Sequence, residues 1–249
     1  MKALLLAGLS TAAFTGILAT TSVANAGTLT QTSVYKQTLL DRENVPETYL
    51  NEGYGLASEI QNSVLSVQKF NSKDKQLKSV TVNFSGDIKT DGGFENRFSQ
   101  ARTIVLNVGG NLNLNLPNGT SLLNLNPTTS TNYSVARYDG RRDYAGTSGR
   151  TFEGLTASAS AQQTFTEQSF LQQFIGNGTL NFLFSAIANP SVTGSPSTSS
   201  DFDSYARGSV NVTYEYEEVA KAVPEPSFML AMGLLTGVGV LSQRKKNVR

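Results

Sequence analysis

Apolar and polar residues alternate one by one along several stretches of the chain. In the clearest stretch, residues 80–85, the apolar members are Val80, Val82 and Phe84. The same alternation returns at residues 104–108, 111–116, 180–184 and 210–216. A period of two places apolar side chains on one face of a β-strand and polar side chains on the other. The pattern therefore predicts a domain built from sheets that each bury one face.

Short sequences typical of turns lie between these stretches. Gly109-Gly110 and Asn118-Gly119 predict tight turns, and a polar loop is expected over residues 190–200. Helical spacing stands out in one short stretch, residues 170–175, which Gly176 is expected to end as a C-cap. Strands without alternating helices favour antiparallel pairing, so we expect an all-β, jelly-roll-like antiparallel β-sandwich.

The composition limits the chemistry that the chain can perform. Its 249 residues include no histidine, cysteine or tryptophan. These absences exclude disulfides, metal sites with histidine or cysteine ligands, and nucleophiles that need an imidazole base. The formal net charge of +1 and the pI of about 7.8 give no electrostatic basis for binding nucleic acid.

Residues 1–26 have the layout of a secretory signal peptide. Lys2 supplies the positive start, and residues 3–19 form an apolar segment that is expected to be a signal helix. Ala24 and Ala26 then provide the two small residues of a signal peptidase site. The mature chain is expected to begin near Gly27. The alternative is a membrane anchor that stays uncut.

Residues 220–249 form a tail with three parts. The first part is a proline-glutamate-proline motif formed by Pro224, Glu225 and Pro226. An apolar run over residues 228–241 follows. The tail then ends in a basic segment that contains Arg244, Lys245, Lys246 and Arg249. The positive-inside rule keeps the basic end cytoplasmic and leaves the preceding domain outside. The apolar run predicts a short transmembrane helix, but a stable span needs about 20 residues. We interpret the tail as a processing signal, with an ordinary tail anchor as the alternative.

This tail resembles the PEP-CTERM sorting signal, in which the same three parts occur in the same order at the C-terminus. In that family an exosortase, a membrane-embedded protease, recognises the Pro-Glu-Pro motif and cuts near it. The resemblance implies an exosortase as a processing enzyme, in addition to the signal peptidase expected at Ala24 and Ala26, and transient membrane attachment through the C-terminal segment. It also implies delivery to the cell envelope or to extracellular polysaccharide of a bacterium with an outer membrane.

Residues 27–219 are expected to form one domain, and part of it resembles the choice-of-anchor E domains. Four pieces carry the resemblance, in the order expected: residues 70–82, 138–149, 174–179 and 210–216. In that family the same domain is attached to different surface-sorting tails. The resemblance therefore implies a location and a domain boundary, and it implies no activity.

The densest cluster of polar residues is at 138–149. Asp139 and Asp143 lie four residues apart among glycines, and such carboxylates could bind calcium together with loop carbonyls. Arg141 and Arg142 lie between the two aspartates and favour ion pairs in a structural turn instead. We expect a structural segment without a cofactor, with calcium as the alternative.

Two further kinds of chemistry need only residues that the chain contains. Glycoside hydrolysis needs two carboxyl groups, and carbohydrate binding uses exposed aromatic side chains. The tyrosine candidates are Tyr138, Tyr144, Tyr205, Tyr214 and Tyr216. No pattern selects a pair of carboxyl groups, so we expect a non-enzymatic, exported surface or matrix protein with exopolysaccharide as a possible partner. A carbohydrate-binding module and a polysaccharide hydrolase are the alternatives.

Overall fold

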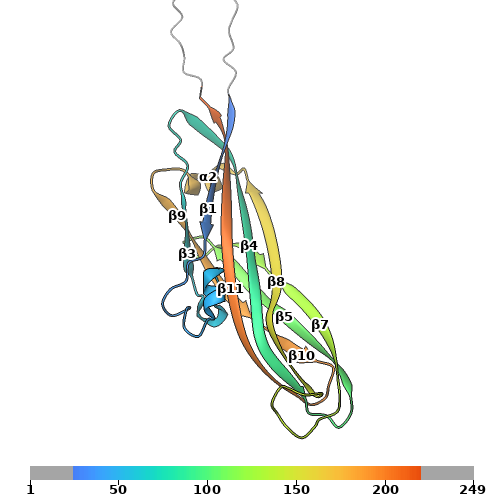
Figure 1. Ribbon diagram of the computed structural model, residues 1–249. Coiled ribbons are helices and arrows are strands. Elements are labelled where there is room, and N and C mark those ends of the chain that lie inside the picture. Colours follow the sequence, from blue (N-terminus) through green and yellow to red (C-terminus); the bar gives the residue numbers. More distant parts are fainter. Residues whose placement is uncertain (1–24, 220–249) are drawn as a thin grey trace, which may run out of the picture. The chain divides into compact units, whose positions relative to one another are not determined.

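The structure is a computed structural model that describes residues 25–219 (Figure 1). Residues 26–219 form one compact unit. Ala24, the Pro-Glu-Pro motif, the apolar run and the basic end lie outside the described residues, so the predictions for them stay predictions. Over residues 25–219, no helix has the length and apolar character needed to cross a bilayer.

Strands make up most of the domain. They are β1 Ala26–Val34, β2 Gly55–Leu56, β3 Ser63–Gln68, β4 Lys75–Asn96, β5 Arg102–Asn115, β6 Ser121–Leu125, β7 Thr128–Val135, β8 Gly149–Phe165, β9 Thr179–Ala188, β10 Ser191–Thr193 and β11 Thr198–Glu218. The helical elements are short: α1 Glu47–Asn51, η1 Ala57–Glu59, α2 Gln168–Leu171 and η2 Gln172–Phe174.

The strands form two antiparallel sheets. The five-stranded sheet has the order β1-β11-β4-β8, with β2 beside β11. In the six-stranded sheet, β5 pairs along one edge with β9 and β10 and along the other edge with β6 and β7, and β3 lies on the far side of β9. Because β6 continues into β7 and β9 into β10 after a short break, each pair acts as one interrupted strand. Eight strands then give the sheet orders 1-8-3-6 and 5-4-7-2, which is the jelly-roll arrangement. The predicted jelly-roll-like sandwich is confirmed.

The core lies between the sheets and follows the alternation seen in the sequence. Val80, Val82 and Phe84 of β4 are fully buried, and the Phe84 ring lies 5.9 Å from the ring of Phe184 on β9. Each such side chain contributes about 1.5–3 kcal/mol by leaving water. Among the described residues, the buried side chains of this core lie between Tyr35 and Tyr214.

Two local predictions are confirmed. Residues 168–174 form α2 and η2, which bury Leu171 and Phe174. Gly176 is not the predicted C-cap, because its N–H donates to the Phe70 carbonyl at 3.0 Å and not to a carbonyl of the helix. Asn118-Gly119 forms the turn from β5 to β6. Its glycine has a φ of +83° and donates its N–H to the Leu116 carbonyl at 2.9 Å.

The turn predicted at Gly109-Gly110 is wrong, because both glycines lie inside β5. The neighbouring strands break at this level, β6–β7 at Pro127 and β9–β10 at Pro190, and proline cannot donate to a ladder. The Gly109 carbonyl accepts the N–H of Asn189 at 2.8 Å, and Gly110 donates to the Pro127 carbonyl at 3.1 Å. A Cβ on Gly109 would lie 2.4 Å from that carbonyl oxygen. The glycines permit close approach between strands and do not reverse the chain.

The polar loop predicted over residues 190–200 is also wrong in most of its length. Residues 191–193 form β10, and β11 begins at Thr198, opposite Asn96 of β4. Only residues 194–197 remain as a turn. Serine and threonine are tolerated here because backbone hydrogen bonds to β4 and β5 hold the strands while many of these side chains face solvent.

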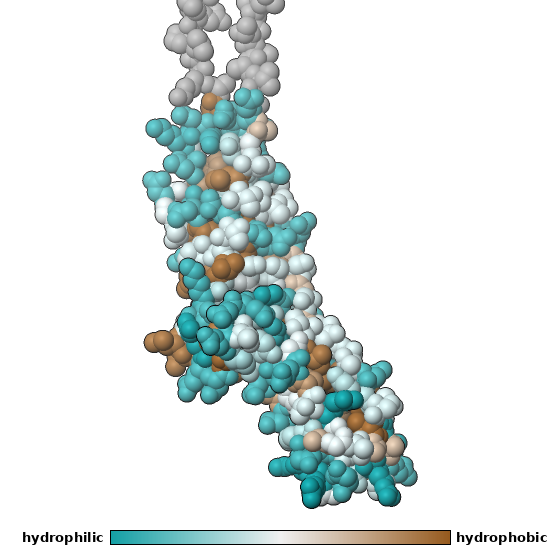
Figure 2. All heavy atoms as spheres, in the orientation of Figure 1, coloured by the Kyte–Doolittle hydropathy of each residue, from teal (hydrophilic) through white to brown (hydrophobic). Residues whose placement is uncertain are grey.

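The two longest strands run the length of the domain. β4 has 22 residues and β11 has 21, which at about 3.3 Å per residue gives roughly 70 Å. Ala26 of β1 is opposite Glu217 of β11, so the first and last strands meet at one end, while the β4–β5, β7–β8 and β10–β11 connections lie at the other (Figure 1). The face seen in Figure 2 is mostly hydrophilic, with small separate hydrophobic patches.

Candidate functional site

The β7–β8 loop contains the two aspartates considered as calcium ligands. Asp139 Oδ1 accepts the N–H of Arg141 at 2.8 Å, and Asp143 Oδ1 accepts the N–H of Ala145 at 3.1 Å. Gly140 has a φ of +99°. Side chains that cap backbone N–H groups two residues ahead, next to a glycine of positive φ, are typical of structural turns.

The predicted ion pairs within this loop are wrong. Arg141 and Arg142 take part in no ion pair of the described residues, because all four charged side chains are exposed and separately solvated. Within residues 25–219, no three acidic side chains gather as a metal-binding group. Asp201 and Asp203, two further acidic residues close in sequence, lie on β11.

A buried carboxyl group lies beneath the same loop. Glu95 is 0% exposed, and neither of its carboxyl oxygens has a hydrogen-bond partner among the described residues. Gly149 lies directly opposite on β8, and a Cβ on it would lie 2.5 Å from Glu95 Oε2. A buried polar group without a partner costs about 1–3 kcal/mol or more. Glu95 is therefore expected to destabilise this end of the domain.

The five tyrosines considered for carbohydrate binding do not form one site. Tyr205 and Tyr214 are buried, and burial raises the pKa of each to about 12. Tyr216 is half-buried, with its ring 5.3 Å from the Phe70 ring. Tyr138 and Tyr144, the remaining two candidates, are partly exposed in the β7–β8 loop. Most of the set packs the interior.

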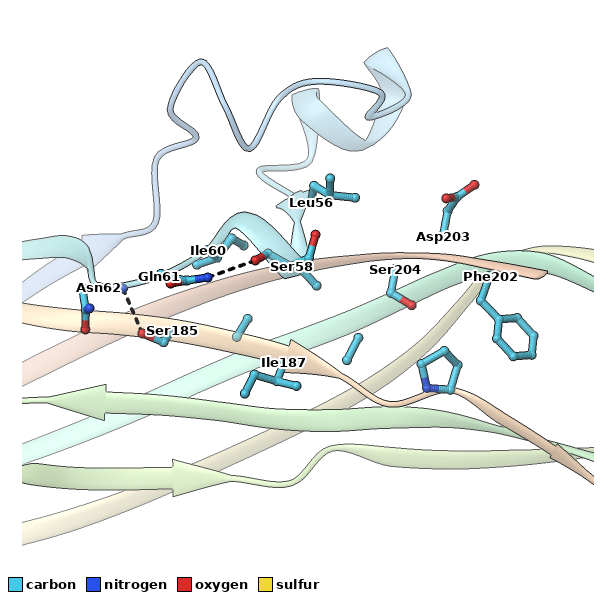
Figure 3. Close-up of a pocket in the computed structure, with 14 residues that line it drawn as sticks. Leu56, Ser58, Ile60, Gln61, Asn62, Ser185, Ile187, Phe202, Asp203 and Ser204 are labelled. Carbon is cyan, nitrogen blue, oxygen red and sulfur yellow. Dashed lines mark hydrogen bonds between the residues drawn. The ribbon is translucent and has the colours of Figure 1, made fainter. Parts of the chain in front are cut away.

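A cleft of about 820 Å³ opens at the edge of the sandwich, beside the segment from Leu56 at the end of β2 to Asn62 before β3 (Figure 3). Figure 3 shows Ser58 and Asn62 on one side, Ile187 of β9 on another, and residues 202–204 of β11 beside them. Its walls carry a single carboxyl group, Asp203. Glycoside hydrolysis needs two, so this cleft lacks the pair.

A cavity of about 390 Å³ beside α1 has two carboxyl groups, Glu52 and Asp87. Glu52 pairs with Lys89 at 2.5 Å, and Asp87 pairs with Arg207 at 2.6 Å. Lys89 is only 8% exposed and lies 4.4 Å from the centre of the Tyr54 ring. Both carboxyl groups therefore help to hold the α1 segment on the five-stranded sheet.

A third hollow, of about 510 Å³, crosses the outer face of the six-stranded sheet where its strands break. Gly109 forms part of its floor because it has no side chain. The polar side chains that line it are Asn107, Asn111, Asn126, Thr128, Thr129, Ser130 and Asn189, and none of its lining residues is charged. We call it the asparagine groove.

Asn111 and Asn126 of the groove form a hydrogen-bonded network with Asn113 and Asn124, which lie just beyond its lining residues. Asn111 donates to Asn124 and Asn126, each at 2.9 Å, and its Oδ1 accepts from Asn113 at 2.5 Å and from Asn124 at 3.2 Å. Asn124 also donates to Asn113 and accepts from Asn126 at 3.1 Å. An amide has two donors and two acceptor sites. Asn111 and Asn124 are therefore saturated, whereas Asn113 and Asn126 each keep one donor and one acceptor for a ligand.

The comparisons with known proteins add little. No protein-family model matches the chain, and no curated protein matches it. The structure of the infectious bursal disease virus Gx strain is similar at a TM-score of 0.16, with 11% identity over 81% of this chain and 58% of that one. The infectious bursal disease virus VP2 subviral particle gives 0.17 and 8%, over 81% and 59%. The chain thus spans under two thirds of either protein. Likenesses this weak carry no argument.

The asparagine groove has no counterpart among the sites predicted from the sequence. Three features of the sequence point to it. Asn111, Asn113 and Asn115 alternate with leucines, two Asn-Pro steps occur at 126–127 and 189–190, and no charged residue lies between Arg102 and Arg137. These residues come together only in the folded sheet, where β5 pairs with β6 and β7 on one edge and with β9 and β10 on the other.

Proposed function

We propose that this protein is an exported, surface-sorted, non-enzymatic component of a bacterial envelope or exopolysaccharide matrix, processed by a signal peptidase and an exosortase. One observation carries the proposal. β1 begins at Ala26, next to the predicted mature start at Gly27, and β11 ends at Glu218, before Pro224. Both predicted cuts therefore fall outside the residues that form the buried core of the compact unit of residues 26–219.

The three hollows described above support a non-enzymatic role. The edge cleft has one carboxyl group. The two carboxyl groups of the cavity beside α1, Glu52 and Asp87, are paired with Lys89 and Arg207. The asparagine groove has amides and hydroxyls, which bind without supplying an acid or a base. Carbohydrate binding, the second candidate function, is favoured by this groove.

The proposal is tested by recovering the protein from the surface or medium of its own cells. N-terminal sequencing should begin at or near Gly27, and intact mass should lack everything beyond the Pro-Glu-Pro region. A Glu225→Ala variant should retain the tail, while the neighbouring Glu218→Ala variant should be processed normally. A chain that starts at Met1, or a wild-type protein that keeps Arg249, would contradict the proposal.

A further inference from the structure

We propose that the asparagine groove binds a chain of uncharged polysaccharide along β5. This inference rests on the proposed function, because it assigns a ligand class to a protein located in a polysaccharide matrix. The ligand would be a neutral, hydroxyl-rich polymer held by hydrogen bonds from amide and hydroxyl side chains.

The amide network gives the groove a fixed pattern of donors and acceptors. The saturated amides of Asn111 and Asn124 hold the orientations of Asn113 and Asn126, whose remaining donor and acceptor can face a ligand. On the other side of the groove, Ser130 Oγ donates to Asn107 Oδ1 at 2.7 Å, which fixes that amide too. Groups that are already ordered lose little entropy on binding. A sugar hydroxyl both donates and accepts, so it matches such a pair.

The absence of charge selects the class of polysaccharide. No charged residue lies between Arg102 and Arg137, and the groove is lined by neutral residues from β5, from β7 and from the β6–β7 and β9–β10 breaks. An acidic polymer or a lipid headgroup would find no cation to compensate the loss of its hydration. A neutral glycan loses only hydrogen bonds to water, which the amides replace.

The length of the array fits a polymer rather than a single sugar. From Asn107 to Asn113 the outward side chains extend over six residues of β5, roughly 20 Å at 3.3 Å per residue. Ile187, a wall residue of the edge cleft that lies opposite Asn111 and just beyond the groove's lining, is 57% exposed and offers apolar area to the C–H face of a sugar ring that extends past the groove. No aromatic ring lines the groove, so each contact is expected to be weak, and affinity should come from several repeats binding together.

The test uses the domain of residues 27–219, immobilised and exposed to soluble polysaccharides. The neutral panel contains α-glucan, β-glucan, galactomannan and galactan, and alginate is the charged probe. Asn107→Ala and Asn126→Ala should each weaken binding to a neutral polymer about threefold to tenfold, the loss of one or two hydrogen bonds. Asn181→Ala is the matched control, because Ser66 Oγ donates to Asn181 Oδ1 at 2.8 Å on the same sheet but away from the groove.

The proposal is supported if a neutral polymer binds, alginate does not, and only the two groove variants lose affinity. It is overturned if no neutral polymer binds, if alginate binds as well, or if Asn181→Ala weakens binding equally. A dimer in sedimentation that Asn126→Ala dissociates would also overturn it, since a second copy would then cover the groove. If the domain binds no neutral polysaccharide, the results on export and processing still stand. If the exported protein keeps both its N-terminal segment and its C-terminal tail, the proposed function is refuted while glycan binding is unaffected.

Discussion

Replacing Tyr35 by phenylalanine tests how the segment after β1 is attached to the sandwich. Tyr35 is 4% exposed, its ring lies 5.5 Å from that of Phe184, and its hydroxyl donates to Asp41 Oδ2. Asp41 is 1% exposed, and its other oxygen accepts from Thr38 Oγ1 at 2.5 Å. Burial and the bond to Asp41 raise the pKa of Tyr35 well above its usual value. The substitution keeps the ring and removes one of the two side-chain donors to a buried carboxylate.

A hydrogen bond to a charged group contributes about 1.5–3 kcal/mol, against about 0.5–1.5 kcal/mol for a neutral pair. Tyr35→Phe should therefore lower the free energy of unfolding by about 2 kcal/mol. With a urea dependence of about 2 kcal/mol per molar, the midpoint moves down by about 1 M at unchanged slope. Tyr214→Phe, which loses a bond of 2.8 Å to the neutral Gln68 carbonyl, should show about half that shift.

Tyr216→Phe is the control for removing a hydroxyl without a buried charged partner, and it should leave the midpoint nearly unchanged. The reasoning is refuted if Tyr35→Phe shifts the urea midpoint no further than Tyr216→Phe does. It is also refuted if Tyr214→Phe has the larger effect, because the charge of the acceptor would then not decide the magnitude.

Three further predictions concern buried groups and the β7–β8 loop. Glu95→Met replaces a buried carboxyl group that has no hydrogen-bond partner among the described residues by an apolar side chain of similar size, and it should raise the free energy of unfolding by about 1–3 kcal/mol. A lower free energy of unfolding in the same urea titration would show that the carboxyl group stabilises the fold. Millimolar calcium and EDTA should give the same Tm, whereas a ligand at 100 times its Kd would add about 2.7 kcal/mol, so a rise in Tm that Asp143→Ala abolishes would contradict the structural interpretation of the loop. Five of the nine tyrosines have a raised pKa, about 12 for Tyr205 and Tyr214, so the folded protein should form part of its phenolate absorbance only well above pH 10. Because these pKa values exceed the unfolded value of about 10, the folded state binds more protons there and stability should fall as pH rises from 10 to 12; a single titration of all nine near pH 10 by the native protein would contradict this.

The strands could be predicted because their side chains alternate with the period of the backbone. Val80 and Val82 alternate with polar residues because one face of their strand is buried, and several such strands without long helices favour an antiparallel sandwich. The jelly-roll strand order depends on the pairings between distant strands. The breaks within strands could not be predicted, since a glycine pair and an Asn-Pro step look alike in a turn and in a sheet. At Gly109 the choice depends on Pro127 and Asn189, which approach only after folding.

The candidate sites were harder to predict than the fold. The capping role of Asp139 could be predicted from the local glycines, because such turns involve neighbours in sequence. Ion pairing of Arg141 could not, because exposed charges are stabilised as well by water. The amide network joins Asn111 to Asn124 across two strands, so the sequence shows only asparagines at alternate positions.

The pairing of the first and last strands determines how the domain bears mechanical load. A force between Ala26 and Glu218 acts on adjacent ends of β1 and β11 and opens their hydrogen bonds one pair after another, as in unzipping. A force between the end of β11 and the far connections acts along β4 and β11, which remain paired from Thr198 to Glu218. Their hydrogen bonds then resist in shear, many at once. A domain pulled by its C-terminal end from one side and by the far end from the other is therefore loaded in its strongest direction.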